Sequence, residues 1–289
     1  MGWRVVVIES ECRISYKNGF ILLKKIDDVS VHISEIDVLI ISTTQISFTG
    51  VALNELTKNK VKIIFCDEKH NPLGEFVSYY GCYNSPKCIQ KQIAWADDVK
   101  GAVFSCIIKQ KILNQSKVLE KYGFEDECKL LQKYYTEVQC NDLTNREGHA
   151  AKVYFNAIFG SGFVRHTETC INAALNYGYT ILLSYINREI VSNGRLTQLG
   201  LKHCSEYNEF NLSCDFIEPF RVLIDDFVIA NPPTNVDQQY KRKIIEILAK
   251  KVVFCEKEMY FSNVVSACVK SILNALDLGK VDELKLYEF

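Results

Sequence analysis

The sequence predicts an α+β fold, in which an N-terminal β-rich, sandwich-like domain is followed by a larger all-α domain. Residues 1 to about 80 alternate short runs of β-branched residues with turn signals, as the strands of a sheet do. From about residue 87 onward, apolar residues recur at intervals of three and four, which is the spacing of amphipathic helices. The 289 residues are 48% hydrophobic and 24% charged, which is ordinary for one large or two smaller folded domains.

Seven short runs are expected to form the strands of the first domain: RVVVIES, RISY, FILLKK, VSVHI, VLIIS, ISFT and VKIIFCD. Asn18 and Gly19 separate the second run from the third and predict a hairpin, because both residues tolerate positive φ. Before the last run, TGVALNELTKN predicts a helix with Thr49 as its N-cap. The structure-breaking Asn-Ser-Pro at 84–86 places the boundary between a domain at 1–82 and a domain at 87–289.

The second domain reads as a series of helices: CIQKQIAWADDVKGAVFSCIIKQKILNQSKVLEKYG, EDECKLLQKYYTEVQ, TCINAALNYGYTILLSYINREIVSNG, KRKIIEILAKKV and MYFSNVVSACVKSILNALDLG. Gly194 is expected to end the third of these as a C-terminal cap. Residues 87–121 hold seven lysines against only three acids. That run is either a solvated helix face or a surface that follows DNA phosphates.

Charge and cysteine content limit the possible classes. The formal net charge is −1, so binding to nucleic acid would depend on local cations or on a metal ion. None of the twelve cysteines forms a C-x-x-C pair, which argues against a closed zinc site. The start of the sequence lacks the apolar core of a signal peptide, and no apolar run is long enough to span a membrane. We therefore expect a cytoplasmic protein without a membrane partner.

The first stretch that could contribute to a catalytic or metal site is LTNREGHAAKVYFNAIFG, which contains Glu147. Thr144 precedes Glu147 by three residues, which is the spacing of a capping box, so Glu147 is expected either to cap a helix or to point into a site. This stretch alone favours the cap.

The second stretch is HCSEYNEFNLSCDFIEPFR, where acids stand among apolar residues. Asp215 and Glu218 are three residues apart and would share one face of a helix, which Pro219 should kink or start irregularly. Buried carboxylates need a counter-charge, so the surrounding Phe and Ile residues favour a nearby cation over a solvated helix face. His203 alone would more often be a structural histidine.

Together these residues supply several carboxylates and one imidazole. This donor set suits Mg²⁺ or Mn²⁺ better than zinc, and such sites commonly act on phosphates.

Four segments carry a resemblance to a known family: NREGHAAKVYF, NAALNYGYTIL, LGLKH and NLSCDFIEPFR. They resemble the CRISPR-associated adaptation integrase, the larger subunit of the spacer-acquisition complex, over about residues 5–275. The N-terminal residues from VLIIS to LGEF also look like the β domain of that family. NYGYTIL and FCDEKHNPLGEF look most like the integrases of type II systems.

The resemblance implies a role for each candidate residue. Glu147 matches the first metal-ligand Glu, and His203 matches the His of the G-x-x-H motif. Glu218 matches the later acidic ligand, which is Asp in many relatives. Asp215 matches the neighbouring acid, which either binds the metal or contacts a residue that does. The implied catalytic set is therefore Glu147, His203, Asp215 and Glu218, with Glu147, His203 and Glu218 holding Mg²⁺ or Mn²⁺.

The implied reaction joins 3′-hydroxyl ends of captured double-stranded DNA to the CRISPR repeat by transesterification. Arg146, Arg165 and Arg221 are expected to contact phosphates, because a guanidinium matches phosphate geometry. Expected partners are double-stranded DNA, a second copy in a homodimer formed through the β domain, a small ferredoxin-like companion subunit and other CRISPR effector proteins. A non-catalytic DNA-binding assembly subunit and an unrelated metal-dependent phosphodiesterase remain alternatives.

Overall fold

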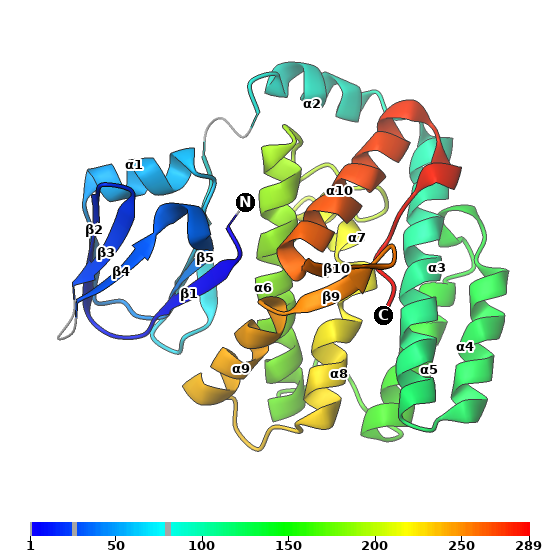
Figure 1. Ribbon diagram of the computed structural model, residues 1–289. Helices are drawn as coiled ribbons and strands as arrows, with labels where there is room; N and C mark the ends of the chain where they lie inside the picture. Colours follow the sequence, from blue (N-terminus) through cyan, green and yellow to red (C-terminus); the bar gives the residue numbers. More distant parts are fainter. Residues whose placement is uncertain (1, 25–27, 79–81) are drawn as a thin grey trace.

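The computed structural model describes residues 2–24, 28–78 and 82–289 and confirms the α+β class. A strand-rich part comes first, and a larger helical part follows it (Figure 1). The strands of the first part are β1 (Arg4–Ile8), β2 (Cys12–Lys17), β3 (Phe20–Lys24), β4 (Val29–His32), β5 (Ile36–Ile41), β6 (Ile46–Phe48), β7 (Lys62–Cys66) and β8 (Pro72–Phe76), with helix α1 (Gly50–Lys58) before β7. Residues 79–81 lie outside the described residues, so the predicted boundary between 82 and 87 stays a prediction.

Local signals placed several of these elements correctly. Asn18 and Gly19 have φ of 49° and 87° and join β2 to β3 in an antiparallel hairpin. The Thr49 hydroxyl accepts a hydrogen bond from the N–H of Ala52 and caps α1, as expected. Residues 67–71 form a turn, and Pro72 then begins β8.

Two four-stranded sheets form the predicted sandwich. One sheet has the order β1-β5-β7-β8 and the other β4-β3-β2-β6. Side chains alternate across β5: Leu39 and Ile41 face the second sheet, whereas Val38 and Ile40 join the core of the helical part. The first sheet is therefore covered on both faces within one chain. Covering this sheet therefore does not require a second copy, and the expected homodimer stays a prediction.

The long helix α6 lies on the side of the helical part that faces the strand-rich part (Figure 1). Its helices are α2 (Ser85–Ile93), α3 (Asp97–Lys121), α4 (Glu125–Glu137), α5 (Arg146–Phe159), α6 (Cys170–Ser192), α7 (Asn211–Phe216), α8 (Val222–Ala230), α9 (Gln238–Leu248) and α10 (Phe261–Leu278). Gly194, with φ of 71°, follows the end of α6 as predicted. α6 and α8 pack so closely that a Cβ on Gly178 would lie 2.4 Å from Cγ2 of Ile224.

The helical part also contains a hairpin that the sequence did not predict. β9 (Lys251–Phe254) pairs antiparallel with β10 (Lys257–Tyr260), where helical runs were expected to continue to residue 252 and to begin at residue 259. The turn residues Cys255 and Glu256 both have positive φ, which neither residue type signals. This hairpin is the departure from an all-α second domain.

A buried group of charges, which we call the interface cluster, joins the two parts. It consists of Asp37, Lys62, Glu75, Arg188 and Glu189. Arg188 of α6 donates to Asp37 of β5 at 2.6 Å and to Glu189 at 3.1 Å, and Lys62 pairs with Glu75. These pairs fix α6 against the sheet. In the described ranges, no helix has the length and apolar character needed to cross a membrane.

Candidate functional site

Glu147 lies in the first turn of α5, but it does not cap that helix. The N-cap is Asn145, whose side chain accepts from the N–H of Gly148, and the carboxylate of Asp142 accepts from the N–H groups of residues 146 and 147. The predicted cap at Thr144 is therefore wrong, because the left-handed turn before α5 brings Asp142 and Asn145 to the helix start instead. The Glu147 side chain is left to point toward α3.

Glu218 lies where the backbone breaks between α7 and α8. α7 ends at Phe216, the 3-10 turn η3 (Glu218–Phe220) follows, and Pro219 explains why the helix is not continuous. The amide of Asn114 in α3 donates to the carbonyl of Pro219 at 2.8 Å and so fixes this turn.

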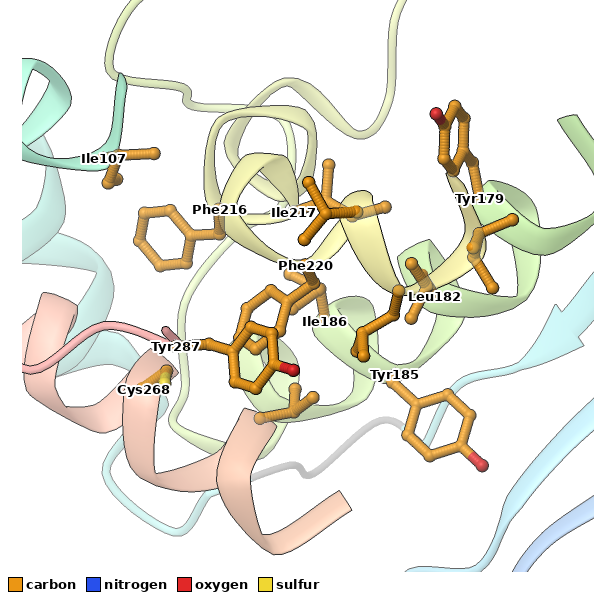
Figure 2. Packing of buried hydrophobic residues seen from close by; sticks show 14 of the residues in the cluster. Ile107, Tyr179, Leu182, Tyr185, Ile186, Phe216, Ile217, Phe220, Cys268 and Tyr287 are labelled. Carbon is orange, nitrogen blue, oxygen red and sulfur yellow. The ribbon is translucent and has the colours of Figure 1, made fainter. Parts of the chain in front are cut away.

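Apolar side chains anchor the same turn from beneath. Figure 2 shows Phe216, Ile217 and Phe220 within the core, with the ring of Tyr287 beside that of Phe220. The last two rings are stacked, with their centroids 5.6 Å apart. The expectation that Asp215 and Glu218 are buried is confirmed, since their residues are 0% and 3% exposed.

Asp215 holds the loop that carries His203. Its carboxylate accepts from the backbone N–H groups of residues 201, 202 and 203, and from Nδ1 of His203 at 2.7 Å. The hydrogen bond that His203 donates to Asp215 raises the pKa of His203, although burial opposes the shift. Gly200 is needed at the start of this loop, because a Cβ there would lie 2.2 Å from the His203 carbonyl oxygen. Asp215 thus orients His203 and leaves Nε2 of the neutral imidazole available to a ligand.

Lys111 of α3 joins the two glutamates. Its Nζ lies 2.6 Å from Oε1 of Glu147 and 2.5 Å from Oε2 of Glu218. Burial alone would lower the pKa of Lys111, but the carboxylates of Glu218 and Glu147 hold it above its ordinary value. The second oxygen of Glu218 accepts from Arg221 at 2.9–3.0 Å.

Glu218 therefore stays ionised. Burial opposes its charge, but Arg221 and Lys111 lower the pKa of this carboxyl to about 2. The structure thus brings Glu147 and Glu218 together around one cation, and it pairs His203 with Asp215.

The predicted metal ligands are not arranged as a finished metal site. Among the residues that the structure describes, no group of three or more His, Cys, Asp or Glu side chains is placed to hold a metal ion. The ammonium of Lys111 lies between the two glutamates instead. The donor chemistry still fits a divalent ion, since this carboxylate pair already holds a cation and His203 is oriented by a carboxylate. The ligand set stays a prediction.

The three predicted phosphate-contacting arginines occupy different surroundings. Arg165 and Arg221 line a cavity of about 180 Å³ together with Lys111 and Glu218, and both lie over the ring of Tyr179. Arg146, in contrast, pairs with Glu137 at 3.1 Å outside that cavity.

The same cavity contains groups that sequence reasoning missed. Lys111 was one of seven lysines in its run, and nothing local distinguished it. Asp225, also buried in the cavity wall, accepts from the hydroxyl of Tyr179. Burial raises the pKa of Asp225 to about 6, although the hydrogen bond from Tyr179 and the nearby arginines oppose the shift.

Most of the chain matches one known protein family. Residues 5–236 match the family described as CRISPR associated protein Cas1. The chain belongs to the Cas1 family. Within this family, it is 35% identical over 230 residues to the CRISPR-associated endonuclease Cas1 of Neisseria meningitidis, with 79% of the chain and 76% of that relative covered.

Solved structures share the fold of this Cas1 protein. A Cas6-RT-Cas1–Cas2 complex contains a chain that matches 99% of it at a TM-score of 0.74 and 18% identity. The present chain spans only 36% of that longer one. A casposase bound to an integration product matches 96% of the chain, with 91% of the casposase covered, at a TM-score of 0.66 and 18% identity.

Proposed function

We propose that this protein is the divalent-metal-dependent integrase and endonuclease of CRISPR adaptation. It joins 3′-hydroxyl ends of captured double-stranded DNA to the CRISPR repeat. Membership of the Cas1 family supports the biological role. The observation that carries the chemistry is the pair of glutamates that already share a cation beside a carboxylate-oriented histidine.

The reaction is a transesterification. The 3′-oxygen of the incoming strand attacks a phosphorus at the repeat boundary, and the bond from that phosphorus to the 3′-oxygen of the flanking DNA breaks. The attacking hydroxyl loses its proton, and the leaving oxygen gains one. One phosphodiester replaces another, so no external energy source and no covalent enzyme intermediate are required. Hydrolysis of DNA at the same centre would use water as the nucleophile.

The residues of the chain divide this work. Glu147, Glu218 and Nε2 of His203 would hold Mg²⁺ or Mn²⁺, and Asp215 keeps the imidazole in the required orientation. When bound, the ion supplies charge stabilisation for the phosphate and for the oxygens that attack and leave. Arg165 and Arg221 lie in the adjacent cavity, where their guanidinium groups suit a flanking phosphate.

The assembly is also part of this proposal. We place the protein in the cytoplasm, in a type II system, as a homodimer formed through the strand-rich domain. It would act with double-stranded DNA and a small ferredoxin-like companion subunit. The presence of Cas2 in the structurally similar complex supports such a companion. Sedimentation showing a monomer at micromolar concentration would contradict the dimer.

The test is strand transfer in Mn²⁺, with a plasmid that bears the repeat and a labelled duplex. We expect a joined product with a 3′-hydroxyl duplex and none with the same duplex ended in 3′-dideoxynucleotides. DNA binding without any joining would favour a non-catalytic assembly subunit. Cleavage without joining, and without preference for the repeat, would favour an unrelated phosphodiesterase.

A further inference from the structure

Lys111 occupies the place between the two glutamates that a divalent ion would need. Its side chain is only 10% exposed, and its ammonium lies within 2.6 Å of both Glu147 and Glu218. An ammonium and a divalent ion both seek carboxylate oxygens, and their like charges repel strongly at such short range. Lys111 and a metal ion therefore cannot share the same pair of oxygens.

A second acceptor for this ammonium lies on the same helix. Gln115 is one turn beyond Lys111 in α3 and lines the cavity of about 180 Å³ that also contains Lys111. The Oε1 of Gln115 is buried and has no hydrogen-bond partner in the part of the chain that the structure describes. A buried acceptor without a donor is costly, so this oxygen offers a place for a displaced donor.

Charge balance favours such a displacement. With neutral His203, the carboxylates of Glu147, Asp215 and Glu218 exceed the cations Lys111 and Arg221 by one negative charge. A divalent ion that arrives while Lys111 stays nearby turns this excess into one positive charge. That charge is the complement of one phosphodiester group.

We propose that Lys111 is a positioning residue that holds Glu147 and Glu218 together before metal binds and turns to Gln115 when a divalent ion displaces it. The inference rests on the proposed function, because it assumes that the ion binds at this carboxylate pair. Lys111 thereby keeps two like-charged carboxylates close together in the metal-free protein. It also remains in the site as a cation after the ion has entered.

The first test measures Mn²⁺ affinity from the electron paramagnetic resonance signal of the free ion. Removing the competing charge in Lys111→Met should tighten Mn²⁺ binding by about tenfold or more. Lys111→Gln, which keeps a hydrogen-bond donor, should show the same direction and serves if the first variant does not fold. The matched control is Lys117→Met, two turns along α3, where the lysine pairs with Glu288 at the surface and affinity should not change.

The second test is a double-mutant cycle with Gln115→Met. In the wild-type background this change removes the second acceptor and should weaken Mn²⁺ binding by about threefold to tenfold. In the Lys111→Met background it should have almost no effect, because no ammonium needs that acceptor. A lysine with a purely structural role would not produce this coupling.

Each outcome bears on the inference. If both Lys111 variants bind Mn²⁺ as tightly as the wild type or more weakly, Lys111 does not compete with the metal ion. If Gln115→Met has the same effect in both backgrounds, the Lys111 ammonium does not move to Gln115. Glu218→Gln distinguishes the proposed function from this inference. If wild-type binding of Mn²⁺ does not depend on Glu218, the metal centre itself is misplaced and the inference falls with it.

Discussion

Two clusters of buried charge among the described residues, the interface cluster and the candidate site, differ in what surrounds them. In the interface cluster, the side chains of Asp37, Arg188 and Glu189 are 5%, 8% and 2% exposed. In the candidate site, Lys111 and Glu218 are equally buried, but Glu147 is 26% exposed and His203 is 43% exposed. The candidate site therefore includes a carboxylate and an imidazole that solvent reaches. In the interface cluster, Asp37, Arg188 and Glu189 are almost fully buried between the sheet and α6, although Arg188 also lines a separate cavity of about 740 Å³.

This difference separates structural charge from charge that can react. An enclosed ion pair can only hold two elements in register, and its removal leaves a buried charge without a partner. A cluster whose carboxylate and imidazole are partly exposed can exchange its cation for another and admit a substrate. The most buried members of the two clusters look alike, and the exposure of Glu147 and His203 makes the difference.

The largest expected difference is in activity. Glu218→Gln and Glu189→Gln each remove a buried carboxylate that is paired with an arginine. We expect the first to lower strand transfer by about a thousandfold or more, since it removes a proposed metal ligand, while the protein stays folded at 25 °C. The second should leave activity per folded molecule almost unchanged. Retained strand transfer in Glu218→Gln, measured beside circular dichroism, would count directly against metal catalysis at this site.

The next difference is in stability. Arg188→Met leaves Asp37 and Glu189 buried without their arginine and should lower the free energy of unfolding by about 3–5 kcal/mol. Arg221→Met should lower it by less, because Glu218 keeps its contact with Lys111. Denaturant titrations of both variants measure this. If Arg221→Met proves the more damaging, the two clusters do not differ in the way proposed.

A third prediction concerns pH. The pKa of Asp225 is raised to about 6 in the folded chain, against about 3.9 in an unfolded one. The native state therefore holds the proton more tightly, and this group's contribution to stability falls as pH rises from about 4 to about 6, by about 3 kcal/mol. Asp225→Asn should remove that part of the pH dependence.

The control for this measurement is Asp226→Asn, the neighbouring position, whose carboxylate pairs with half-exposed Lys121. Stability should be followed by denaturation between pH 4 and pH 7. A wild-type curve parallel to that of Asp225→Asn would show that Asp225 titrates normally.

The smallest effect concerns DNA affinity. Arg165→Ala should weaken binding of all duplexes similarly, by a few fold. The slope of the logarithm of the binding constant against the logarithm of the salt concentration should become shallower by about one. Arg146→Ala, at the third predicted phosphate contact, should weaken binding less, since Arg146 is held by Glu137 outside the cavity. A salt series with two duplexes of equal length and different sequence measures both slopes. An equal loss in the two variants would remove the distinction between them.

The sequence predicted features that depend on local chemistry. The Asn18-Gly19 hairpin, the Thr49 cap and the break at Pro219 each follow from the conformation that a few adjacent residues allow. The resemblance to the integrase family drew attention to Glu147 and Glu218, and the structure brings both to one cation.

Features that depend on tertiary packing could not be predicted in this way. Lys111 is 36 residues before Glu147 and looks like its neighbouring lysines; its burial follows only from the packing of α3 against α5 and η3. The cap at Thr144 failed because a left-handed turn brought Asp142 to the helix start. The turn of the β9–β10 hairpin uses Cys255 and Glu256, residue types that carry no turn signal.

The most direct test of the central claim is a crystal soaked in Mn²⁺ and measured at the manganese absorption edge. The account predicts one anomalous peak within coordinating distance of Glu147, Glu218 and Nε2 of His203, with the Lys111 ammonium moved toward Gln115. A peak at another position, or a site without a peak in which Lys111 still joins the two glutamates, would contradict it.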